Sequence, residues 1–241
     1  MLHIGADEIA LTSQTEPAEL PWGMLDVDLV LECTGQLVHR GPCEMHLRAG
    51  ARKVLVAAPC EGADATIVYG VNDNTLEATH QVVSNASSTT HCLAPVARVL
   101  HEQFAIVDGT FTALHSYTND QQLLDLAQGA DLYRSRAAGL SLIPSQSGAA
   151  LTIGLVLPGL EGRLDGRAVR VPTPNVSLLD LTVQVSRAAS RDEVNEAMKT
   201  AADLTPILEY SDRPLVSTDF NHRSASAIFD ATQTLGRGPL V

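Results

Sequence analysis

The sequence predicts an α/β fold in residues 1–86, built on a parallel sheet, followed by an α+β fold in residues 87–241, whose mostly antiparallel sheet carries helices on one side. A strand, a helix and a strand follow one another within about 30 residues from Val27 to Ala57, which is typical of a parallel βαβ unit. Residues 179–186 alternate apolar and polar side chains, which favours an antiparallel strand with one buried face. From Leu93 to Phe104 the apolar side chains recur with helical spacing.

Composition and charge narrow the classes of protein and partner. The 241 residues are 45% apolar, which is ample for a core, and the formal net charge of −12 argues against nucleic acid and anionic membranes as partners. No apolar run approaches the roughly 20 residues of a membrane span. Four cysteines without C-x-x-C pairing or zinc spacing predict reduced thiols in a cytoplasmic protein and no metal site.

The first part contains two candidate ligand-binding turns. Thr34-Gly35 follow the predicted strand 27–32, and Ala57-Ala58 end the predicted strand 53–57. The carboxyl ends of parallel strands are where an open α/β sheet binds its ligand, although an ordinary turn also explains a lone Thr-Gly pair. The remaining predictions for this part are strands near Ile4, residues 9–11 and residues 66–69, a loop at 17–21 and a helix near 44–49.

The second part begins where a strand ends and a helix starts, at the hydroxyl-rich residues Ser87, Ser88 and Thr89. A helix N-terminus with free N–H groups binds anions and lowers the pKa of a nucleophile, although Ser87 or Ser88 could simply cap the helix. A long strand over 105–114 should end at His115, and Ser190 to Glu193 form a capping box before another helix. Short strands are predicted near 207–210, 215–218 and 227–229.

Residues 84–95, S-N-A-S-S-T-T-H-C-L-A-P, resemble the active-site segment S-N-A-S-C-T-T-N-C-L-A-P of the phosphorylating glyceraldehyde-3-phosphate dehydrogenase family. Ser88 stands where the family has its catalytic cysteine, and His91 where it has an asparagine. The resemblance also includes H-S-Y-T at 115–118 and R-V-P-T-P-N at 170–175, and it runs from about Ile4 to Thr234. It implies an incomplete Rossmann-type NAD-binding domain over 1–86 and the family's catalytic domain over 87–241.

The resemblance assigns roles to individual residues. It implies that Ser88 and His115 are the catalytic pair, with the histidine as base. It implies NAD as the cofactor, beside Thr34, Gly35, Ala57 and Ala58. The substrate is expected to be a sugar phosphate, with inorganic phosphate or water as the acyl acceptor, and the assembly a homo-tetramer. The residues implied in holding the substrate and its phosphate are Ser87, Thr89, Thr118, Asp120, Arg134, Ser147, Gly148 and Arg170.

Two branches of the family resemble the chain. The longer matches, at 64–72, 119–122 and 219–222, are more similar to erythrose-4-phosphate dehydrogenase, whereas Thr118, Pro174 and Ser147-Gly148 are more similar to the glyceraldehyde enzyme. The longer matches favour the erythrose branch. No G-x-G-x-x-G occurs, so we expect a chain that begins after the family's Gly-rich segment and ends before its closing helix, either as a fragment or through loss.

A serine in place of the catalytic cysteine predicts little dehydrogenase activity. A thiol with a reference pKa of about 8.5 forms a thiolate far more readily than serine forms an alkoxide, and Cys92 does not replace it. Two other functions stay open at this stage. One is a non-catalytic relative that keeps the phosphate site and acts as a binding or assembly partner. The other is a serine esterase built on Ser88 and His115, which lacks G-x-S-x-G and a third triad member.

Overall fold

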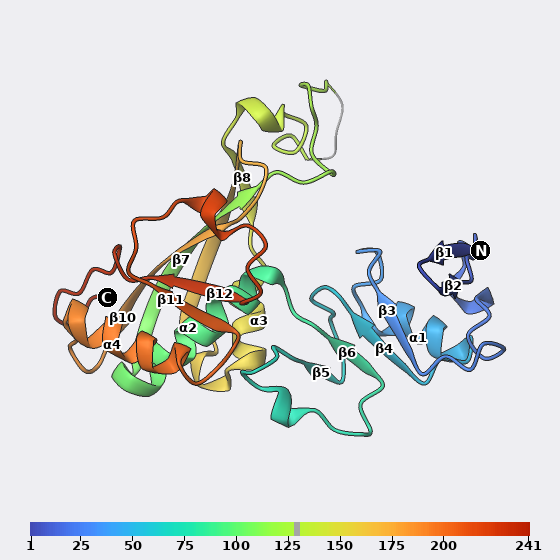
Figure 1. Cartoon of the computed structure of the whole chain (residues 1–241), viewed down its shortest axis with the longest axis horizontal. Coiled ribbons are helices and arrows are strands. Elements are labelled where there is room, and N and C mark those ends of the chain that lie inside the picture. Colours follow the sequence, from blue (N-terminus) through green and yellow to red (C-terminus); the bar gives the residue numbers. More distant parts are fainter. Residues whose placement is uncertain (128–130) are drawn as a thin grey trace. The chain divides into compact units, whose positions relative to one another are not determined.

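The computed structural model describes residues 1–127 and 131–241. The chain divides into two compact units. Unit 1 comprises residues 1–67 and 75–85, and unit 2 comprises residues 68–74 and 86–241. Figure 1 colours the chain along its sequence, from blue at the N-terminus to red at the C-terminus.

Unit 1 is built on a four-stranded, fully parallel sheet with the order β3-β4-β6-β5. Its helix α1 (Arg40–Arg48) connects β3 to β4, as a βαβ crossover requires. The α/β prediction for this part of the chain is confirmed by the parallel sheet and the crossover helix. The buried core of the unit is small and consists of Cys43, Val54, Val56, Cys60 and Val82. Its strands are β1 (Leu2–Ile4), β2 (Asp7–Ile9), β3 (Leu29–Glu32), β4 (Lys53–Val56), β5 (Ala65–Thr66) and β6 (Val82–Ser84).

Unit 2 contains a four-stranded sheet of order β10-β7-β9-β8. The outer pairs, β10 with β7 and β8 with β9, are antiparallel, and the central pair of β7 and β9 is parallel, so the expected mostly antiparallel sheet is confirmed. A separate parallel pair joins β11 to β12. The strands are β7 (Ile106–Ser116), β8 (Ile143–Gln146), β9 (Leu164–Val171), β10 (Leu178–Val185), β11 (Leu208–Ser211) and β12 (Ala227–Asp230).

Helix α2 (Ser88–Phe104) is the centre of the core of unit 2 (Figure 1). Its apolar face contacts side chains of the main sheet and of the two other helices, α3 (Ala149–Val156) and α4 (Arg191–Ala202). Leu93 and Phe104 are fully buried there with Phe111 of β7. Burial of each such side chain contributes about 1.5–3 kcal/mol to the stability of the fold. The packing of α2 therefore holds its N-terminal residues in place.

Two predicted strands differ in the structure. The strand predicted at 66–69 ends at Thr66, because the Val68 N–H donates to the Asn72 side chain and the chain turns. The strand predicted at 215–218 is replaced by a 3₁₀ turn, since the Asp219 carboxylate accepts the Val216 N–H at 2.8 Å. The 3₁₀ segments are Pro17–Glu19, Asp73–Thr75, Ala138–Leu140, Pro158–Leu160 and Ser217–Phe220.

Candidate active site

Three hydroxyl side chains organise the N-terminus of α2. Ser87 is the residue that caps the helix: its Oγ accepts the Thr90 N–H at 3.1 Å. The fully buried Thr90 hydroxyl lies 2.8 Å from Ser87 Oγ and 2.6 Å from the hydroxyl of Thr152 in α3. The capping interpretation of Ser87 is therefore correct, and Ser88, the first residue of the helix, is left exposed beside it.

His115 lies at the end of β7 and is held through both ring nitrogens. Nε2 lies 3.3 Å from the buried Thr89 hydroxyl, and Nδ1 lies 2.9 Å from the hydroxyl of Ser177. In the part of the chain that the structure describes, no hydrogen bond joins His115 to Ser88, the partner expected from the sequence; Thr89, the next residue, takes that place. Ser177 was missed by sequence reasoning, and its position two residues after R-V-P-T-P-N is its only signal.

The strand register brings Arg170 beside His115. The two residues are direct partners in the parallel ladder of β7 and β9, and the Arg170 Nη1 donates to the Ser116 carbonyl at 2.9 Å. The Arg170 Nε is buried and has no hydrogen-bond partner among the described residues. Burial lowers the pKa of His115, and the positive charge of Arg170 lowers it further. The site thus combines a neutral imidazole with a cation that has an unused donor.

A second cation adjoins this pair. Arg134 forms an ion pair with Asp120 at 2.7 Å, and the Thr118 hydroxyl donates to the other oxygen of the same carboxylate. The hydrogen bond from Thr118, followed by the charges of Arg134 and Arg170, lowers the pKa of Asp120. These interactions connect Thr118, Asp120 and Arg134 to Arg170 in one cluster. Residues 128–130, which lie between Asp120 and Arg134 in the sequence, are outside the described residues.

Ser147 and Gly148 lie at the start of α3. The Ser147 hydroxyl accepts the Ala149 N–H at 3.4 Å, and the Gly148 carbonyl accepts the Thr152 hydroxyl at 3.1 Å. Because Thr152 is also bonded to Thr90, the first turns of α2 and α3 lie next to each other. Both helix N-termini carry partial positive charge, which favours an anion between them.

The expected cofactor residues lie in unit 1, at the carboxyl ends of its parallel strands. Thr34 and Gly35 follow β3, and Gly35 has a φ of +71°, which favours glycine. Ala57 and Ala58 follow β4; the Ala57 N–H donates to the Glu32 carbonyl and the Ala58 carbonyl accepts the Ser84 hydroxyl at 2.8 Å. The ends of β3, β4 and β6 are thus tied together.

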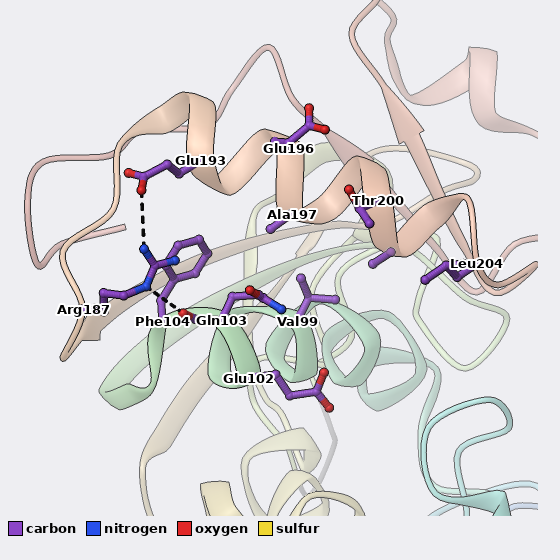
Figure 2. A pocket seen from close by; sticks show the side chains of 11 residues that line it. Val99, Glu102, Gln103, Phe104, Arg187, Glu193, Glu196, Ala197, Thr200 and Leu204 are labelled. Carbon is purple, nitrogen blue, oxygen red and sulfur yellow. Dashed lines mark hydrogen bonds and ion pairs between the residues drawn. The ribbon is translucent and has the colours of Figure 1, made fainter.

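A cavity of about 470 Å³ lies between the carboxyl half of α2 and helix α4, away from the first turn of α2 (Figure 2). Its only cation, among the described residues, is Arg187, which lies 4.5 Å above the Phe104 ring and is ion-paired with Glu193. Glu102 and Glu196 also line it. Three carboxylates against one paired cation disfavour a sugar phosphate here.

No cluster of three or more metal-ligating side chains occurs within residues 1–127 and 131–241. Over the same residues, every helix is too short or too polar to cross a bilayer.

Replacing Arg170 by Met is expected to raise the pKa of His115 toward the ordinary value of about 6.5, because the nearby positive charge is lost. The ring resonances of His115, followed by NMR across pH, measure this change. Arg167→Met on the same strand is the control and should leave the titration unchanged. A His115 titration that is identical in parent and Arg170→Met would contradict the coupling.

The same shift gives a pH dependence of stability. The unfolded chain binds a proton at His115 more tightly than the folded chain, so the free energy of unfolding falls as pH drops from about 6.5 to the lowered pKa. Urea unfolding of parent and Arg170→Met at several pH values measures it. The loss between pH 7 and 5 should be smaller in the variant.

Similarity to known proteins identifies the family of this chain. Residues 87–238 match the family model described as glyceraldehyde 3-phosphate dehydrogenase, C-terminal domain. The chain is 54% identical over 240 residues to glyceraldehyde-3-phosphate dehydrogenase of Pseudomonas aeruginosa. The matched residues make up 100% of this chain and 72% of that protein. It is 49% identical over 237 residues to the protein of the same name from Geobacillus stearothermophilus, covering 97% of the chain and 70% of the relative. The chain therefore belongs to the glyceraldehyde-3-phosphate dehydrogenase family.

Proposed function

We propose that this chain binds an aldose phosphate between the N-terminus of α2, His115 and Arg170, in the site where its family oxidises sugar phosphates with NAD. The observation that carries the proposal is the register of β7 and β9, which sets a neutral imidazole and a cation with an unused donor side by side. Thr89 connects that pair to the helix N-terminus. This combination of groups suits a small molecule that carries both a phosphate and an aldehyde, because the cation can bind the phosphate and the imidazole can accept a proton.

Within this site each group has a proposed role. Arg170 and Arg134 hold the phosphate, with Thr118 and Asp120 fixing Arg134. The hydroxyls and N–H groups of Ser87, Thr89, Ser147 and Gly148 form the second anion-binding surface, at the two helix ends. His115, kept neutral by burial and Arg170, accepts the proton of a nucleophile.

For the cofactor, we propose residues 1–86, most of which belong to unit 1, as the NAD-binding part, and residues 87–241, which belong to unit 2, as the catalytic domain. Bound NAD would take up the hydride that leaves the aldehyde carbon. The residues present fit one part of a dinucleotide: Gly35 has positive φ, nothing lies within 4 Å of the position of an added Cβ, and the ends of three parallel strands meet there. No G-x-G-x-x-G is present in the 241 residues to hold the pyrophosphate.

Ser88 is proposed to impair turnover. Its hydroxyl is exposed, and within the described residues it has no hydrogen bond to a base, whereas an alkoxide needs both a matched base and an oxyanion site. The same observation favours the second candidate function, a relative that binds sugar phosphate or assembles with other subunits without catalysis. The exposed Leu123, Leu124, Leu140 and Leu142 between β7 and β8 support the proposed homo-tetramer. Four free cysteines support a cytoplasmic protein.

For the substrate we propose glyceraldehyde 3-phosphate first, because the relatives at about 50% identity carry that name. The sequence likeness at 64–72 and 219–222 favours erythrose 4-phosphate as the second candidate. Calorimetric titration of the chain with each aldose phosphate, and separately with NAD, tests the proposal. Binding of either aldose phosphate with micromolar to millimolar Kd is expected, and the tighter one identifies the substrate.

The two functions differ in the NAD titration. Binding of both an aldose phosphate and NAD supports a dehydrogenase chain, and binding of the sugar phosphate without NAD supports the non-catalytic relative. If neither aldose phosphate binds even at a ligand concentration of about 10 mM, tenfold above the weakest expected Kd, the proposed site is wrong. Unphosphorylated erythrose is the control and should bind at least tenfold more weakly, because it lacks the anion that Arg170 recognises.

A further inference from the structure

A chain of hydrogen bonds in unit 1 takes no part in the roles proposed above. Glu32, the last residue of β3, and His46 of α1 are 5% and 4% exposed. The His46 Nε2 lies 3.1 Å from one oxygen of Glu32, and the Trp22 Nε1 lies 3.0 Å from the His46 Nδ1. The other oxygen of Glu32 accepts both the N–H, at 2.7 Å, and the hydroxyl of Thr34. Trp22, His46, Glu32 and Thr34 are called the Trp–His–Glu–Thr chain below.

The chemistry of the four groups fixes where each proton lies. An indole N–H only donates, so the His46 Nδ1 must be an acceptor, and the proton of the neutral ring must be on Nε2. Nε2 then donates to Glu32, as do both groups of Thr34. Burial acts to raise the pKa of Glu32, but the bonds from Thr34 and His46 outweigh it and lower the pKa. The buried Glu32 carboxylate therefore accepts three hydrogen bonds, one from His46 and two from Thr34.

The turn after β3 depends on this carboxylate for its shape. Among the described residues, no backbone-to-backbone hydrogen bond involves residues 34–36. The Thr34 N–H is bonded to Glu32 instead, and the Gln36 N–H donates to the Thr34 hydroxyl at 3.2 Å. Gly35 can adopt many backbone conformations, so a side-chain hydrogen bond near the turn must select its φ of +71°. The bonds from Thr34 to Glu32 are the ones that can do so.

We infer that Glu32, His46 and Trp22 are positioning residues that hold the Thr34–Gly35 turn in the conformation that receives a dinucleotide. Trp22 selects the tautomer of His46, His46 orients the Glu32 carboxylate, and Glu32 fixes Thr34. The identity of the ligand rests on the proposed function, but the fixing of the turn does not. None of the three side chains needs to touch the ligand for this effect.

Glu32→Gln tests the inference because the amide replaces one of the two acceptor oxygens, on which three donors converge, by an NH₂ group that can only donate. Its NH₂ must face either the His46 Nε2–H or the donors of Thr34. Adding Trp22→Phe removes the indole donor, so His46 can move its proton to Nδ1 and accept the amide through Nε2. The amide oxygen is then free for Thr34. The double variant should therefore recover what the single variant loses, which a merely space-filling role does not predict.

Two measurements are independent of any ligand. The ¹⁵N spectrum of the His46 ring should show the proton on Nε2 in the parent chain and on Nδ1 in the double variant. Amide exchange at Thr34 should be at least tenfold faster in Glu32→Gln and return toward the parent value in the double variant, with Trp22→Phe alone close to the parent. A proton on Nδ1 in the parent, or unchanged Thr34 exchange in Glu32→Gln, overturns the inference.

A third measurement relates the turn to the cofactor. The Kd for NAD, measured by calorimetry, should rise about tenfold in Glu32→Gln and fall again in the double variant. If the parent itself does not bind NAD, the proposed cofactor is wrong, while the tautomer and the exchange rates still decide whether these residues position the turn. Normal NAD binding by a Glu32→Gln variant whose Thr34 amide has lost its protection overturns the link between the two.

Discussion

Ser88→Cys is expected to raise NADH formation from an aldose phosphate by at least ~10³-fold over the parent chain, since losing the nucleophile of a covalent mechanism costs several powers of ten. The substituted thiol would lie at the first position of α2, next to Thr89 and therefore close to His115. A helix N-terminus and a nearby base both favour the thiolate. Initial rates with glyceraldehyde 3-phosphate, NAD and phosphate measure the change.

A readout without cofactor separates nucleophile chemistry from NAD binding. The thiol introduced by Ser88→Cys should react with iodoacetamide at neutral pH much faster than Cys92, because burial raises the pKa of Cys92 to about 11. Ser88→Ala is the matched control, and its rate of NADH formation from the aldose phosphate should equal that of the parent. Equal rates for parent and Ser88→Cys, with the new thiol reactive, would mean that the serine is not what limits turnover.

Arg170→Met should weaken aldose-phosphate binding by about 30–150-fold, which corresponds to about 2–3 kcal/mol for charge-assisted hydrogen bonds. The half-buried Arg170 lies beside His115, and its buried Nε has no hydrogen-bond partner among the described residues. In a chain with a formal net charge of −12, a local cation has to supply the attraction for a phosphate. Calorimetric Kd values for glyceraldehyde 3-phosphate measure the loss.

Two variants control this prediction. Arg167→Met removes an exposed arginine from the same strand and should change the Kd by less than about twofold. Arg170→Lys keeps the charge but not the planar pair of donors, so its Kd should lie between those of the parent and Arg170→Met. An Arg170→Met variant that folds normally and binds as tightly as the parent would remove Arg170 from the site.

Patterns that depend on local chemistry could be predicted from the sequence. The capping box at Ser190 is present with Glu193, and the helical spacing from Leu93 to Phe104 gives the buried face of α2. The alternation predicted at 179–186 corresponds to β10, which ends at Val185. Each of these patterns has its physical cause within one or two turns of chain, so neighbouring residues suffice to read it.

Elements and contacts that depend on distant residues could not be predicted in this way. Helix α3 is apolar on its exposed side as well as on its buried side, since Leu151 and Leu155 are 83% and 63% exposed, so no helical periodicity marked it. Strands β8 and β9 were also missed. The pairing of His115 with Ser177 spans 62 positions and results from the sheet. The same reason explains why Thr89 rather than Ser88 lies nearest the imidazole: the orientation of the first turn of α2 relative to β7 is set by packing.

The most direct test of the proposed site follows the ring resonances of His115 by NMR while glyceraldehyde 3-phosphate is added. A site shared by the helix N-terminus, His115 and Arg170 predicts a saturable shift of these resonances in the parent chain and no saturable shift in Arg170→Met over the same concentrations. If calorimetry shows binding of the sugar phosphate while the His115 resonances stay unchanged, the ligand lies elsewhere and the proposed site is wrong.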